Sequence, residues 1–115
     1  GGSIGFRLDY PGGHSMAYIT DTTASVDASY IKEIEGVKLL LHECNFQDED
    51  EQLARRTGHS WTSEVARVAV KAGVQKLVLI HVNPLADHLD PVNLAAARAI
   101  FPNTHLGRDG TAMTF

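Results

Sequence analysis

Two short, largely apolar runs stand out along the chain, at residues 37–43 and 76–82. Apolar runs of this length are typical of strands buried on both faces of a sheet. Residues 4–10 and 15–20 alternate more loosely, and the Pro11-Gly12-Gly13 segment between them predicts a tight turn. The pattern therefore predicts an N-terminal hairpin followed by two buried strands, with a last extended segment in residues 104–115.

Four helices are predicted, and apolar residues at helical spacing indicate one of them most clearly. The clearest covers residues 62–72, where Ser60 or Thr62 is expected to cap the start and Gly73 to end the helix. The other three are expected at residues 28–35, 48–56 and 91–100. The element order becomes β-β-α-β-α-α-β-α-β, which predicts an α/β fold with helices packed on a sheet.

Composition supports one globular domain of 115 residues, with 43% apolar and 21% charged residues. The formal charge of −4 argues against broad attraction to nucleic acid, which needs a basic face. Cys44 is the single cysteine, so no internal disulfide can form. Apolar runs stay well below the roughly 20 residues of a membrane span. We therefore expect a cytoplasmic protein with no membrane partner.

Metal-competent side chains stand where predicted strands end. Asp21 follows residues 15–20, Glu43 closes one apolar run, and His81 lies near the end of the other. His59 precedes the clearest helix. Strand ends are where open α/β sheets bind ligands, and carboxylate and imidazole suit zinc, manganese or iron. Taken singly, Asp21 could be a turn residue and His81 a core histidine.

Other polar and aromatic positions favour ordinary structural roles. His14, His42, His88 and His105 lack such a context and are expected to be structural or exposed. Trp61 favours a packed aromatic over a base-stacking side chain.

Several segments, in this order and spacing, resemble the second half of the metallo-β-lactamase superfamily, in the branch that contains ribonuclease Z and related phosphodiesterases. The segments that carry the resemblance are Ala17-Tyr18-Ile19-Thr20-Asp21-Thr22, Leu41-His42-Glu43, Gly58-His59-Ser60 and Lys76-Leu77-Val78-Leu79-Ile80-His81.

The resemblance implies that residues 1–115 are the C-terminal half of a four-layer αββα sandwich, one mixed sheet with helices on one face. It implies a metal-dependent hydrolase with two divalent metal ions, zinc in the first place, manganese or iron as alternatives. Asp21 would bridge the two metals and His81 would be a terminal ligand. Glu43 would orient His59, which would protonate the leaving oxygen of a phosphodiester.

The chain departs from the family pattern in two ways. Cys44-Asn45 stands where the ribonuclease Z branch has Ala-Thr, and Trp61 replaces a second Thr. The main ligand motif, His-x-His-x-Asp-His, is missing, so the chain supplies only part of a site. We therefore expect it to be inactive alone and to pair with its own N-terminal half or a second copy. That partner would cover the second apolar face of strands 37–41 and 77–82. The substrate would be a small-molecule or nucleic-acid phosphodiester.

Two other functions are open at this point. One is a non-catalytic interaction module with the same fold. The other is a serine hydrolase that uses Ser15, because Gly13-His14-Ser15-Met16-Ala17 is similar to a nucleophile elbow. That motif requires a strand, a sharp turn and a helix directly after the serine.

Overall fold

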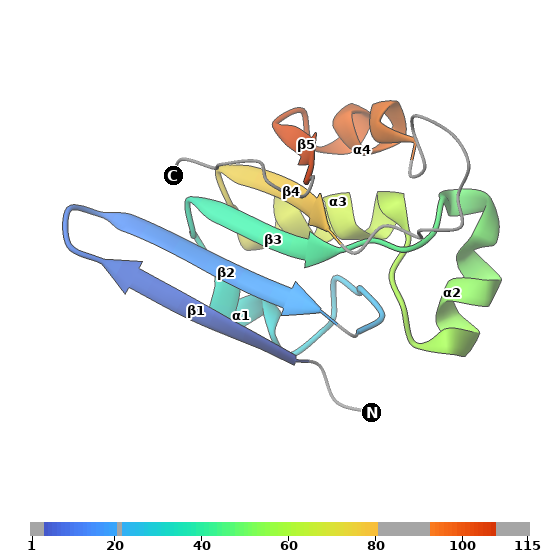
Figure 1. Ribbon diagram of the computed structural model, residues 1–115, viewed down its shortest axis with the longest axis horizontal. Coiled ribbons are helices and arrows are strands. Elements are labelled where there is room, and N and C mark those ends of the chain that lie inside the picture. Colours follow the sequence, from blue (N-terminus) through green and yellow to red (C-terminus); the bar gives the residue numbers. More distant parts are fainter. Residues whose placement is uncertain (1–3, 21, 81–92, 108–115) are drawn as a thin grey trace.

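The computed structural model describes residues 4–20, 22–80 and 93–107, which form a five-stranded sheet with helices (Figure 1). The sheet order is β1-β2-β3-β4-β5, with β1 antiparallel to β2 and every other neighbouring pair parallel. This confirms the predicted hairpin and the mixed sheet. The strands are β1 (Ile4–Tyr10), β2 (His14–Thr20), β3 (Leu39–Glu43), β4 (Lys76–Ile80) and β5 (Thr104–Leu106).

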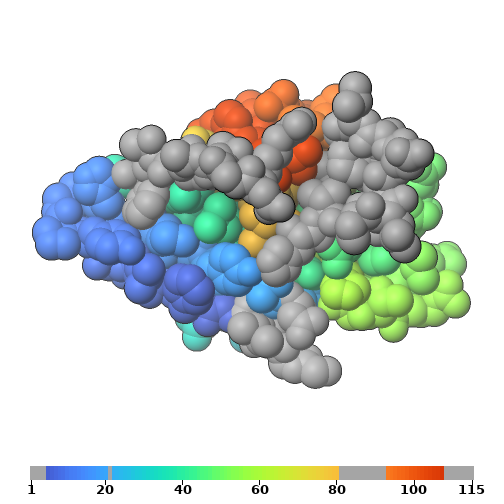
Figure 2. Space-filling view, in the orientation of Figure 1, coloured from blue at the N-terminus to red at the C-terminus, as the bar shows by residue number. Residues whose placement is uncertain are grey.

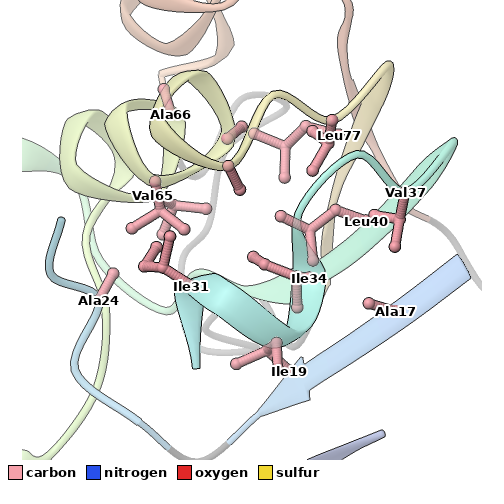
Figure 3. Close-up of a cluster of buried hydrophobic side chains, with 14 of the residues drawn as sticks. Ala17, Ile19, Ala24, Ile31, Ile34, Val37, Leu40, Val65, Ala66 and Leu77 are labelled. Atoms are coloured by element: carbon pink, nitrogen blue, oxygen red, sulfur yellow. The ribbon is translucent and has the colours of Figure 1, made fainter. Parts of the chain in front are cut away.

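Helices α1 and α3 cover one face of this sheet, and α4 packs against α3 and β5 (Figures 1 and 3). The core lies between these helices and the sheet, where Leu40 and Leu77 meet Ile34 and Val65, all buried. None of the helices in the described segments has the length and apolar character needed to cross a membrane. The helices are α1 (Ile31–Ile34), α2 (Glu51–Thr57), α3 (Thr62–Ala72) and α4 (Leu94–Ile100), with a 3₁₀ turn η1 (Asp48–Asp50) before α2.

Three helices differ from the prediction in their bounds. The helix expected at residues 48–56 divides into η1 and α2, and α2 ends at Thr57. The expected helix 28–35 shortens to α1, because the residues before it form turns closed by hydrogen bonds from Ala28 N–H to Ser25 O and from Ile31 N–H to Ala28 O. The described part of the last helix begins at Leu94, after Asn93, whose side chain accepts a hydrogen bond from Ala96 N–H. Pro91, the predicted start, lies outside the described residues.

The predicted cap of α3 is wrong, although its span of 62–72 is confirmed. Trp61 occupies the N-cap position and makes no side-chain cap hydrogen bond. Asp48 performs this task from η1, because its Oδ1 accepts from Ser63 N–H at 2.8 Å. A carboxylate at a helix N-terminus satisfies a free N–H and interacts favourably with the helix dipole.

The face of the sheet opposite the helices is also apolar. One register row across four strands consists of Phe6, Tyr18, Leu41 and Val78. Phe6 is 50% exposed and stacks on Tyr18 with ring centroids 5.4 Å apart, whereas Val78 is fully buried. The exposed end of this face lies on the β1–β2 hairpin, drawn in blue in Figure 2.

Candidate functional site

Three parallel strands end side by side at one edge of the sheet. Ile19 of β2 pairs with His42 of β3, and Glu43 pairs with Ile80 of β4. The residues that directly follow β2 and β4 are Asp21 and His81, the two candidate metal ligands. Both lie outside the described residues, so their convergence stays a prediction, whereas the strands that lead to them share this edge.

Glu43 is the last residue of β3 and its side chain is almost fully buried, with 1% exposed. Its Oε1 accepts a hydrogen bond from Thr22 N–H at 3.3 Å, and its Oε2 lies 3.1 Å from Nδ1 of His59. A carboxylate removed from water needs such donors. The structure therefore brings Glu43 and His59 together and ties Glu43 to the residue that follows Asp21.

His59 reaches this position because the chain reverses sharply after α2. Gly58 adopts a left-handed conformation (φ 76°), which glycine tolerates without steric cost, and His59 N–H then bonds to Ala54 O at 2.9 Å. Phe46 N–H bonds to Ser60 O and Thr62 N–H to Phe46 O, which joins this segment to the chain that leaves β3. The His59 side chain stays 31% exposed.

Asn45 is a contact of His59 that the sequence did not assign. Its Nδ2 lies 3.0 Å from Nδ1 of His59, the same nitrogen that faces Glu43. The signal available in the sequence was its departure from the family pattern, although the contact itself depends on how the 44–46 segment folds beside the 58–62 segment.

Ser60 is the second residue that the sequence did not assign to the site. It is fully buried, donates its hydroxyl proton to Thr22 O at 2.7 Å, and accepts from Ala24 N–H at 2.8 Å. Together with the Glu43 contact to Thr22 N–H, it holds both sides of the backbone that follows Asp21. The predicted cap role of Ser60 is therefore wrong, and Ser60 instead bonds to the backbone of the loop at residues 22–24.

His42 has a structural role, in agreement with the sequence. It faces the helix side of the sheet, where Nδ1–H donates to Glu43 O at 2.8 Å and Nε2 accepts from the Tyr30 hydroxyl at 2.7 Å. Burial lowers the pKa of His42 to about 4, against the hydrogen bond to Glu43 O, which acts in the opposite direction. Burial also raises the pKa of Tyr30, so this pair is neutral over the ordinary pH range.

Trp61 is a packed aromatic, also in agreement with the sequence. It is 3% exposed, and the guanidinium carbon of Arg55 lies 4.5 Å from the centre of its ring. Its burial beneath Arg55 leaves little surface on which a base could stack.

The serine-nucleophile alternative conflicts with the structure. Ser15 lies inside strand β2, with no helix directly after it, and its Oγ accepts a hydrogen bond from Lys38 N–H at 3.0 Å. The strand–turn–helix geometry of a nucleophile elbow is therefore missing.

Metal donors are sparse in the part of the chain that the structure describes. Residues 4–20, 22–80 and 93–107 contain no group of three or more His, Cys, Asp or Glu side chains arranged to hold an ion. Asp21 and His81 have donor atoms of the right kind, a carboxylate and an imidazole. Two donors alone are too few for a site that holds two metal ions.

Curated sequences and solved structures agree on the relationships of the chain. It is 40% identical over 93 residues to ribonuclease Z of Gemmatimonas aurantiaca, covering 81% of this chain and 29% of that protein. It is 41% identical over 101 residues to ribonuclease Z of Gloeothece citriformis, covering 84% and 31%. The chain thus spans about a third of the length of these relatives.

Two solved structures share the fold. The metallo-beta-lactamase fold protein YhfI from Bacillus subtilis superposes with a TM-score of 0.75 at 23% identity, over 95% of this chain and 47% of that one. The short form of human tRNase Z superposes with a TM-score of 0.74 at 21% identity, over 96% and 37%.

A family model described as the beta-lactamase superfamily domain matches residues 1–82, which include the hairpin, Glu43, His59 and both candidate metal ligands. The sheet, with its helices on one face, matches metallo-beta-lactamase fold structures, and the relatives at 40% and 41% identity are ribonuclease Z sequences. This chain therefore belongs to the beta-lactamase superfamily, with the metallo-β-lactamase fold.

Proposed function

We propose that this chain is part of a metal-dependent hydrolase of phosphodiesters. Its contribution would be a proton-donor pair, Glu43 and His59, and two metal ligands, Asp21 and His81. The observation that carries the proposal is the 3.1 Å contact between a buried carboxylate and a partly exposed imidazole. The contact lies at the edge where the strands preceding both ligands end.

The pair has the chemistry of a general acid. Glu43 accepts the Nδ1 proton of His59 and so orients the ring, while Nε2 makes no hydrogen bond within the described residues. A free imidazole nitrogen at a partly exposed position can deliver a proton to a leaving oxygen. The leaving oxygen of a phosphodiester needs such a proton, because it departs as an alkoxide otherwise.

The metal ions would complete this chemistry. Two divalent ions, zinc in the first place and manganese or iron as alternatives, activate a water and stabilise the attacked phosphoryl group when bound. Asp21 would bridge them and His81 would bind one of them. Both follow strands that end beside Glu43, so the ligands and the proton donor would act at the same edge of the sheet.

The remaining ligands would come from outside this chain. We propose that residues 1–115 form the C-terminal half of the domain, and that the N-terminal half of the same protein, or a second copy, supplies the other donors. Two observations support this: the chain covers 29% and 31% of the relatives compared above, and the sheet has a second apolar face. The chain alone would then be inactive.

RNA is the first substrate to test. The relatives carry the name ribonuclease Z, and a solved neighbour carries the name tRNase Z. Cys44, Asn45 and Trp61 replace residues of the ribonuclease Z pattern, so we extend the proposal to phosphodiesters as a class and not to one RNA.

The test is hydrolysis of bis(p-nitrophenyl) phosphate and of a short RNA by the full-length protein, with and without added metal. His59→Ala should lower kcat on the RNA by about 10²–10⁴-fold while bound metal stays unchanged, since the imidazole acts on the leaving group and not on the metal. Hydrolysis of bis(p-nitrophenyl) phosphate should fall far less, because p-nitrophenolate departs without a proton. His105→Ala is the control. It removes an imidazole of β5 that contacts Asn103, and it should leave kcat unchanged.

Proportional loss of metal and activity in His59→Ala would make His59 a ligand and contradict its proposed role. Full metal occupancy without turnover on any phosphodiester would instead favour the non-catalytic interaction module.

A further inference from the structure

Nδ1 of His59 faces two polar groups of opposite kind. Oε2 of Glu43, a hydrogen-bond acceptor, lies 3.1 Å away, and Nδ2 of Asn45, a donor, lies 3.0 Å away. A ring nitrogen either carries a proton or accepts one, so Nδ1 cannot satisfy both groups in the same state. One of the two must set the tautomer of His59, and the other must adapt to it.

The relative strength of the two hydrogen bonds decides the matter in favour of Glu43. A hydrogen bond to a carboxylate is roughly twice as strong as one between neutral groups. Glu43 is also 1% exposed, so a bare Nδ1 would take the described donor away from a buried Oε2. The proton therefore belongs on Nδ1, where Glu43 accepts it.

The amide of Asn45 must then turn its oxygen to the ring. A half-turn about the last side-chain bond exchanges the amide oxygen and nitrogen, and the surrounding network determines which of them faces a neighbour. We infer that Asn45 is a positioning residue whose Oδ1 accepts, together with Glu43 Oε2, from Nδ1–H of His59. Two oxygens thereby hold the ring in one tautomer and one orientation, with Nε2 left for the substrate.

This inference rests on the proposed function of His59 but concerns a different residue. Glu43 alone would leave the ring free to turn about the single hydrogen bond between them. A second acceptor on another side of the same N–H removes that freedom. It also adds a second hydrogen bond to the Nδ1–H form of the ring. Asn45 precedes Phe46, whose backbone is joined to Ser60 and Thr62, so its main chain is fixed relative to His59.

The test measures the tautomer of His59 directly, by nitrogen-15 chemical shifts of the ring in the full-length protein at a pH where the ring is neutral. The His59 signals are assigned by their loss in a His59→Gln variant. Wild-type protein should show Nδ1 protonated and Nε2 bare. Asn45→Leu, similar in shape but without an acceptor, should lower the ratio of Nδ1–H to Nε2–H about fivefold, the equivalent of ~1 kcal/mol for one neutral hydrogen bond.

Two further variants complete the design. Asn45→Asp keeps an acceptor and cannot donate, so it should retain the Nδ1–H tautomer. Asn103→Leu removes an amide that bonds to His105 Nε2 at 2.8 Å, and should change His105 while leaving His59 as it was. In RNA cleavage assays, where the leaving oxygen needs a proton, Asn45→Leu should lower kcat by a similar fivefold factor and leave KM unchanged.

A bare Nδ1 in the wild-type protein would overturn the inference, since Asn45 would then be a donor. An unchanged ratio in Asn45→Leu would also overturn it. If Asn45→Leu fails to fold, the tautomers of wild type and Asn45→Asp still decide between acceptor and donor. An Nδ1–H ring that responds to Asn45 in a protein without phosphodiesterase activity would support the inference and contradict the proposed function.

Discussion

His42 and His59 lie on opposite sides of Glu43 and have opposite environments. His42 is fully buried and both of its ring nitrogens are hydrogen-bonded, whereas His59 is partly exposed and uses Nδ1 only. A fully buried imidazole with two neutral partners resists protonation. His42 therefore has a structural role, whereas His59 keeps Nε2 without a hydrogen bond within the described residues.

His42 should make the protein less stable below pH 6.5. Burial lowers its pKa to about 4, below the ordinary value of 6.5, so between these values the unfolded chain binds a proton that the folded chain does not. Stability should therefore be complete above pH 6.5 and fall by up to about 3 kcal/mol as the pH drops to 4. Urea unfolding of the full-length protein at a series of pH values measures this slope.

His42→Gln keeps hydrogen-bonding groups but cannot titrate, so it should remove this part of the slope. His105→Gln is the control: burial also lowers the pKa of His105, so this variant should remove only its own part of the slope and keep that of His42. An identical slope in wild type and His42→Gln would assign the pH dependence to other groups.

The residues of the candidate site differ in how far the sequence could predict them. Glu43 and His59 stand in short motifs that resemble the family, and that resemblance implied their pairing. The contact of Asn45 with His59 could not be predicted, because a side-chain amide finds its partner only after the 44–46 and 58–62 segments lie side by side. The local sequence does not indicate that these two segments meet.

At the scale of elements, the same limit separates what could be predicted from what could not. The span of α3 follows from helical spacing and from Gly73, both local features. Its cap could not be predicted, since Asp48 acts from fifteen residues earlier in the chain. The short length of α1 goes with the turns closed by Ser25 and Ala28, and the chain just before them contacts another helix, because Val26 N–H bonds to Glu64 Oε2 of α3 at 3.3 Å.

Ser60 links two elements of the site, so its loss should destabilise the protein. Ser60→Ala removes the donor to Thr22 O and the acceptor for Ala24 N–H, leaving two backbone groups beside a fully buried position. Leaving such groups unsatisfied costs about 1–3 kcal/mol, which urea unfolding can measure.

Ser25→Ala is the matched control, because it removes one solvent-exposed hydrogen bond, from Asp27 N–H. Its cost should stay within about 0.5 kcal/mol. Equal effects of the two substitutions would show that the hydrogen bonds of Ser60 to Thr22 and Ala24 contribute little to the stability of the protein.

At the scale of the whole molecule, the sheet has two apolar faces, and the helices of the described residues lie on one of them. Leu8 and Tyr10 are 40% and 45% exposed, and together with Phe6 they form an apolar stripe along β1 on the face opposite the helices. An exposed patch of this kind is typical of a surface that another part of the protein covers. The apolar character of both faces was readable from the sequence. What covers the stripe was not readable, because an apolar face does not identify the surface that packs on it.

Phe6 offers the test of this arrangement in the full-length protein. It is 50% exposed in this chain. If the N-terminal half covers it, Phe6→Ala should cost at least ~2 kcal/mol, since replacing a buried phenylalanine by alanine costs about 3–5 kcal/mol. Val70→Ala is the control, because Val70 is 54% exposed on α3, on the helix side, and its replacement should change stability by less than about 0.5 kcal/mol.

The same two substitutions in the isolated 115-residue chain complete the experiment. There, Phe6→Ala should cost little if the chain is monomeric, and should weaken self-association, measured by light scattering, if a second copy covers the stripe. A small effect of Phe6→Ala in both proteins would mean that β1 faces solvent in the complete molecule, and would contradict the proposal that this chain is one half of a two-sheet domain.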